Sequence, residues 1–219
     1  MLTDWSERTP AVRLQIIETL LSSDAWTLAL LKRPEAKACD AATRARLVKH
    51  PKKEIAKLAA TVFADSVSAT RAAVVEKFKP ALKLTGDAAK GKAVFAQVCI
   101  SCHNLDGVGL ELGPDLRSVV QHDAEKLMNS ILDPSAIIEP GFMAYHCTLK
   151  NGEQLYGVIA TETSASLTLK MAGNVTKSVL RSEIASLKST GTSLMPEGLE
   201  AVMTPQSLAD LIAYLKVVR

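Results

Sequence analysis

The strongest constraint on this chain is the pentapeptide Cys99-Ile100-Ser101-Cys102-His103, which directly follows a stretch with helical periodicity. In that stretch Val94, Phe95 and Val98 share one apolar face, and Asp87 stands where a side chain can cap the helix start. The two thiols lie one helical turn apart, and an imidazole follows the second. One short segment can therefore clamp a whole cofactor.

The C-x-x-C-H pattern is typical of covalent c-type haem attachment, in which the thiols add to two vinyl groups and the imidazole binds the iron. A structural zinc site needs a second pair of ligands, whereas Cys39 and Cys147 are solitary. A redox dithiol would follow a strand. The sequence predicts one covalently attached haem c, bound by Cys99, Cys102 and His103. We expect Cys39 and Cys147 to be buried thiols outside any disulfide.

The length of 219 residues fits two small domains. Residues 1–80 have the pattern of five short helices, and capping residues or prolines mark their starts at Thr9-Pro10, Asp24, Asp40, Pro51 and Ser68. Antiparallel helix pairs with short turns are typical of HEAT repeats, and an unspecific helical bundle fits equally well. We predict an α-helical (HEAT-like) module over 1–80 and a second domain over 81–219.

The second domain interrupts its helices with β-forming sequence. A helix is predicted over 123–132 and a last helix from Thr204-Pro205. Between them, residues 145–188 alternate with period two, and Asn151-Gly152 favours a tight hairpin whose two turn residues both have left-handed backbone angles. A second hairpin is predicted around 172–174 and a fifth strand over 184–188. The predicted fold class is mainly α with a small inserted β meander or barrel.

Composition and charge exclude several classes of function. An apolar fraction of 47% rules out disorder, and a net charge of +3 is too small to indicate nucleic-acid binding. The apolar runs are far shorter than a membrane span, and residues 1–10 lack the features of a secretory signal. Because no catalytic carboxylate pair, nucleophile triad or phosphate loop is evident, we expect an electron-transfer module rather than an enzyme.

Two segments resemble class I cytochromes c: GDAAKGKAVFAQVCISCH (86–103) and ADLIAYLK (209–216). In that family the first and last helices cross at close range, and Gly91, Phe95, Leu211 and Tyr214 match the positions at the crossing. Gly91 lets the two helix axes approach because it lacks a side chain. The resemblance also implies that the backbone carbonyl of Pro114 accepts a hydrogen bond from the proximal imidazole.

The same family places a methionine in an irregular loop shortly before the last helix, and Met195 in SLMPEG matches it. The resemblance therefore implies that His103 and Met195 hold the iron. A thioether ligand raises the reduction potential relative to a second imidazole. The other candidates for the sixth ligand stay open: Met128, Met143, Met171, Met203, His50, His122 and His146.

The order GPDL, ILDPSA, strands and SLMPEGLE is similar to the haem-binding domain of the Pirellula and Verrucomicrobium type. That resemblance implies the C-terminal part of a larger, exported, dehydrogenase-like protein with a periplasmic location. The expected function is to relay single electrons from a redox partner or an attached dehydrogenase domain. A haem-based sensor or a peroxidase-like enzyme with a labile sixth ligand is the alternative.

Overall fold

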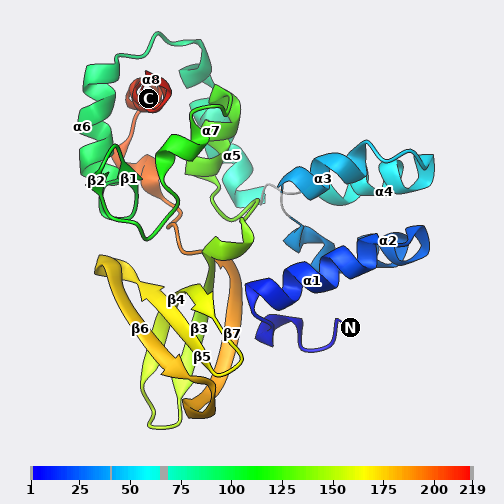
Figure 1. Cartoon of the computed structure of the whole chain (residues 1–219). Coiled ribbons are helices and arrows are strands. Elements are labelled where there is room, and N and C mark those ends of the chain that lie inside the picture. The colour runs from blue at the N-terminus through cyan, green and yellow to red at the C-terminus, as the bar shows by residue number, and fades with distance from the viewer. Residues whose placement is uncertain (1, 40, 65–68, 218–219) are drawn as a thin grey trace. The chain divides into compact units, whose positions relative to one another are not determined.

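The computed structural model describes residues 2–39, 41–64 and 69–217, and the chain divides into two compact units (Figure 1). Unit 1 comprises Met1–Val67, Ser135–Leu169 and Lys177–Leu194, and unit 2 comprises Ser68–Pro134, Lys170–Thr176 and Met195–Arg219. Each unit is assembled from segments far apart in the sequence. The predicted division at residue 80 remains a prediction.

Unit 1 begins with short helices: α1 (Pro10–Leu21), α2 (Asp24–Leu31), α3 (Ala41–Val48) and α4 (Lys53–Ala64). Pro10 occupies the first turn of α1 as predicted, although the Thr9 side chain makes no capping hydrogen bond. Helix α4 begins two residues later than predicted from Pro51. The predicted starts at Asp40 and Ser68 lie outside the described residues. Apolar side chains from these helices form one core: Ile17, Leu30, Leu31, Leu47, Ile55 and Ala59.

The β-forming region is a five-stranded antiparallel sheet with the strand order β6-β5-β4-β3-β7. The strands are β3 (Met143–Leu149), β4 (Gln154–Glu162), β5 (Ser166–Met171), β6 (Val175–Leu180) and β7 (Ile184–Ser193). The first four form the predicted meander, and β7 returns to pair with β3. The sheet is longer than the predicted span of 145–188. Pairing of Met143 with Ser193 extends both strands into sequence without apolar alternation.

The first hairpin has a different turn from the one predicted. Only Gly152 has a positive φ (87°), and its N–H donates to the Leu149 carbonyl at 2.9 Å. Lys150 and Asn151 therefore form the centre of the turn with negative φ, since left-handed angles at two residues are not needed when a glycine follows the turn. The second hairpin turns at 172–174 as predicted, with positive φ at Gly173 and Asn174.

Unit 2 is helical around a single core. Its helices are α5 (Ala69–Phe78), α6 (Ala88–Val98), α7 (Ala124–Leu132) and α8 (Pro205–Val217), and a two-stranded ladder joins β1 (Asn104–Leu105) to β2 (Val108–Gly109). Helix α5 precedes residue 80, yet its Val75 and Phe78 lie in the core with residues of α6, α7 and α8. The core of this unit therefore includes a helix assigned by sequence to the first domain.

Helices α6 and α8 pack closely side by side, as the class I resemblance implies. A Cβ atom on Gly91 would lie 2.0 Å from the Asp210 carbonyl oxygen, so only glycine permits this approach. The Phe95 and Tyr214 rings contact each other with centroids 5.8 Å apart, and Leu211 is buried. The crossing holds the end of α6, and with it the pentapeptide, against the unit 2 core.

The protein is thus mixed α/β and about half helical. The predicted fold class, mainly α with a small β insertion, is too narrow because the antiparallel sheet has five strands. The HEAT-like arrangement of the first helices stays a prediction. In the part of the chain that the structure describes, no helix combines the length and apolarity needed to cross a bilayer.

Candidate haem-binding site

The pentapeptide continues the last turn of α6. Asp87 caps the start of this helix as predicted, and its carboxylate accepts hydrogen bonds from the N–H groups of Ala89 and Lys90. At the other end, the N–H groups of Cys102 and His103 both donate to the Cys99 carbonyl, at 3.0 and 2.9 Å. The backbone therefore remains coiled through the motif, which keeps the two thiols one turn apart, each half-buried.

The His103 imidazole is held by one specific hydrogen bond. Its Nδ1 lies 2.9 Å from the Pro114 carbonyl oxygen, which can only accept, so Nδ1 carries the proton. The lone pair is then on Nε2, the atom available to a metal. The contact implied by the class I resemblance is present, and it fixes both the tautomer and the ring orientation.

The loop after His103 packs against the imidazole without intervening side chains. The Gly113 N–H donates to the Cys102 carbonyl at 2.7 Å, and a Cβ on Gly113 would lie 2.5 Å from Cε1 of the His103 ring. A Cβ on Gly109 would similarly lie 2.1 Å from the His103 carbonyl oxygen. Glycine at both positions lets the backbone wrap closely around the proximal side of the site.

Burial sets the protonation state of the site. Desolvation, and next the neighbouring Cys102, raises the pKa of the Cys99 thiol to about 11. Burial also lowers the pKa of His103, and the hydrogen bond to Pro114 opposes that change only in part. At neutral pH the site therefore presents a neutral thiol at Cys99 and a neutral imidazole, the form of histidine that binds iron. These groups fit a covalently attached haem.

Met195 lies in unit 2 between β7 and the 3-10 helix η8 (Leu199–Val202), in a segment with no helix or strand. Its side chain is half-buried. This is the kind of segment, shortly before the last helix, in which the class I resemblance places the sixth ligand. The ligand role of Met195 remains a prediction.

The other predicted candidates have different surroundings. Met128 and Met203 are buried in the unit 2 core. Nε2 of His122 lies 3.0 Å from Nζ of Lys126, and the exposed His146 ring packs on Tyr156. Met171 is half-buried at the end of β5, and Nε2 of His50 lies 3.7 Å from the Asp24 carboxylate.

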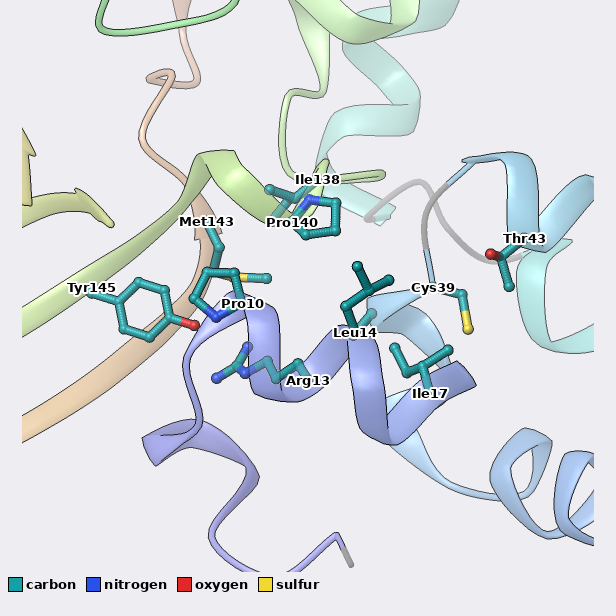
Figure 2. A pocket seen from close by; sticks show the side chains of 11 residues that line it. Pro10, Arg13, Leu14, Ile17, Cys39, Thr43, Ile138, Pro140, Met143 and Tyr145 are labelled. Atoms are coloured by element: carbon teal, nitrogen blue, oxygen red, sulfur yellow. The ribbon is translucent and has the colours of Figure 1, made fainter. Parts of the chain in front are cut away.

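Met143 lines the cavity shown in Figure 2, together with Arg13 and Tyr145. This cavity lies in unit 1 and has a volume of about 20 Å³, the space of one or two water molecules. A porphyrin does not fit there. The buried position of Met143 is explained by packing in this unit.

Cys39 and Cys147 are buried thiols outside any disulfide, as predicted. In the described ranges no group of three or more His, Cys, Asp or Glu side chains could hold a metal ion.

Sequence reasoning missed three residues that build this unit. Gly86 matters because a Cβ there would lie 2.2 Å from the Ala209 carbonyl oxygen. The Asp210 carboxylate accepts the Asp87 N–H at 2.8 Å and so joins α8 to the start of α6. A buried acid within the apolar stripe of the last helix was a visible signal. Arg71, on α5, binds the Leu132 carbonyl and the Glu200 carboxylate. No feature of the sequence around Arg71 indicated these contacts.

A match to a family model identifies a cytochrome c domain over residues 86–157. The family model that matches the chain, over residues 86–157, is described as cytochrome C oxidase, cbb3-type, subunit III. The matched segment begins just before α6 and ends within β4, so it contains the pentapeptide and Pro114 but neither Met195 nor α8. No curated protein matches the chain.

Proposed function

We propose that the chain relays single electrons through one haem c, joined covalently to Cys99 and Cys102, with His103 and Met195 as the iron ligands. The cytochrome c family match implies haem-based electron transfer. The observation that carries the finer proposal is the 2.9 Å hydrogen bond from Nδ1 of His103 to Pro114, directly after two thiols one turn apart. A ring held in this way presents Nε2 in one fixed direction.

The mechanism follows from what these residues hold in place. Haem supplies an iron that changes reversibly by one electron. The two thiols would hold the haem at the end of α6, and the packing of α6 on α8 keeps that end fixed. The hydrogen bond to Pro114 makes the imidazole a better electron donor to the metal. A thioether from Met195 would favour the reduced state of the iron and raise its reduction potential.

The donor of the electrons belongs to the same proposal. The matched family is named for an oxidase subunit, which supports a redox protein as the partner. The resemblance to the haem-binding domain of the Pirellula and Verrucomicrobium type supports an attached dehydrogenase domain and a periplasmic location.

The test uses the full chain matured in a host that attaches haem c. The product should keep its colour through denaturation and acid-acetone extraction, because thioether bonds survive both. The oxidised form should show the weak far-red band of sulfur ligation, and Met195→Ala should remove it. Loss of all colour on extraction would refute covalent attachment. A five-coordinate, high-spin spectrum that Met195→Ala leaves unchanged would instead indicate the sensor or peroxidase-like alternative.

A further inference from the structure

In the described part of unit 2, the Arg71 side chain contacts a carbonyl group and two carboxylates. Its guanidinium binds the Glu200 carboxylate in a fork, with Nη1 2.7 Å from Oε1 and Nη2 2.8 Å from Oε2. Nε donates to the Leu132 carbonyl at 2.8 Å, and Nη2 donates to the same oxygen. The Glu197 carboxylate lies 3.9 Å from Nε. The arginine side chain is only 9% exposed.

These contacts join three segments of unit 2. Arg71 belongs to α5, and Leu132 is the last residue of α7, whose terminal carbonyls lack partners within the helix. Glu197 and Glu200 follow Met195 by two and five residues. Met195 lies in a segment without helix or strand. The contacts of Arg71 with Glu197, Glu200 and the Leu132 carbonyl connect the residues that follow Met195 to α5 and α7.

We propose that Arg71 is a positioning residue for the sixth ligand: its buried contacts to Glu200 and Leu132 hold the Met195 segment at the distance from α7 that keeps the thioether on the iron. This inference rests on the proposed function. It assigns a role in the haem site to α5, which precedes the segment matched by the cytochrome family.

Arginine suits this position because its planar fork can bind a carboxylate with two parallel hydrogen bonds and still donate to a carbonyl. Lysine keeps the charge but presents a single ammonium group on a flexible stem. The substitution Arg71→Lys therefore separates geometry from charge. Glu200→Gln removes the charge of the partner and one half of the fork, from the other side of the same contact.

The experiment measures how firmly the sixth ligand is held in the haem-loaded full chain. An external ligand such as imidazole competes with Met195, so its apparent affinity rises with the fraction of molecules in which the thioether is off the iron. We expect Arg71→Lys to weaken the far-red sulfur band, to lower the reduction potential and to raise imidazole affinity about tenfold. Glu200→Gln should change all three in the same direction.

Lys77→Gln is the matched control, because it removes an exposed positive charge from the same helix. In this variant the sulfur band, the reduction potential and the imidazole affinity should equal those of the wild type. Spectra are taken well below the melting temperature, so that a general loss of stability does not move them. If Arg71→Lys does not fold, the sulfur band, reduction potential and imidazole affinity of Glu200→Gln test the inference.

Two results would overturn the inference, and they are distinguishable. A wild-type protein without the sulfur band would refute Met195 ligation, and the role of Arg71 would fall with it. A wild-type protein with the band, together with folded variants whose band and imidazole affinity match the wild type, would refute the role of Arg71 alone.

Discussion

The two sides of the proposed site are built in different ways. On the His103 side, the pentapeptide and Pro114 lie within 16 consecutive residues, and backbone hydrogen bonds fix their geometry. On the Met195 side, an irregular segment contacts Arg71 through Glu197 and Glu200, which lie more than a hundred residues later in the chain than Arg71. The first side is local, and the second depends on the tertiary fold.

This difference separates two properties of a cytochrome. In the proposed function, covalent attachment and the proximal ligand come from one continuous segment, so they would need little beyond the correct folding of α6 and the following loop. The proposed sixth ligand, and with it the potential, would depend on how α5, α7 and the Met195 segment pack. Substitutions on the two sides should therefore have different signatures.

The largest effect is expected from removing both thiols. Cys99→Ser combined with Cys102→Ser should abolish covalent attachment, because hydroxyl groups do not form the thioether bonds. The measurement is the colour of the denatured protein after acid-acetone extraction. Cys147→Ala, which removes a buried thiol of β3, should leave the attachment intact. A coloured double variant would contradict the assignment of the tether.

The second-largest effect is expected from Gly113→Ala, which should disturb the packing of the loop against the His103 ring. The new Cβ would lie 2.5 Å from the His103 ring, and the ring cannot retreat without losing its hydrogen bond to Pro114. Overpacking of this kind costs about 3 kcal/mol in the free energy of unfolding. Denaturant titration and the haem spectrum measure it. The exposed Glu111→Ala in the same loop is the control, and equal stability of the two variants would argue against a tight proximal contact.

Glu200→Gln tests the Met195 side through its pH dependence. The hydrogen bond from Arg71 lowers the pKa of Glu200. The ionised carboxylate therefore stabilises the fold above its unfolded pKa of about 4.3, and this contribution is lost as the pH falls through the lower folded value. Because Arg71 is buried and a neutral amide would replace the ionised carboxylate in its fork, we expect the free energy of unfolding to fall by about 2 kcal/mol at pH 7.

The measurement is urea unfolding of the wild type and Glu200→Gln over a series of pH values. The difference between the two should shrink below about pH 4. Glu76→Gln, which alters an exposed acid on α5 paired with Lys79, is the control and should cost far less. A difference that stays constant with pH would show that the charge of Glu200 is not what stabilises the segment.

The smallest effect is expected in the sheet, away from both sides of the site. Gly152→Ala places a side chain at a φ of 87°, which costs about 1 kcal/mol. Unfolding curves should show this loss of stability, and the intensity of the far-red band should stay unchanged. Gly141→Ala, where a Cβ meets no atom within 4 Å, is the comparison. An altered band in Gly152→Ala would mean that the hairpin contributes to the site.

Much of the fold was predictable because its signals are local. Asp87 caps α6 and Asp123 caps α7, where a side chain can satisfy free N–H groups at a helix start. Alternation revealed the strands, although not their full length. Thr190 to Ser193 have no apolar alternation, and β7 reaches Ser193 only because Ser193 pairs with Met143 of β3 across a register shift. The turn of the first hairpin was also mispredicted, because strand pairing and not the Asn151-Gly152 dipeptide set its geometry. Only Gly152 has a positive φ there.

By itself, the sequence determined the chemistry of the attachment segment: two thiols, an imidazole and a carbonyl acceptor lie close together because the chain between them is short. The sequence also predicted the close packing of α6 on α8, since Gly91, Phe95 and Tyr214 match the residues at the helix crossing of class I cytochromes c. Only the tertiary structure decided that α5 joins the core of unit 2 and that Arg71 meets Glu200. A contact between residues so far apart in the chain leaves no periodic pattern, because its geometry is set by the packing of whole helices.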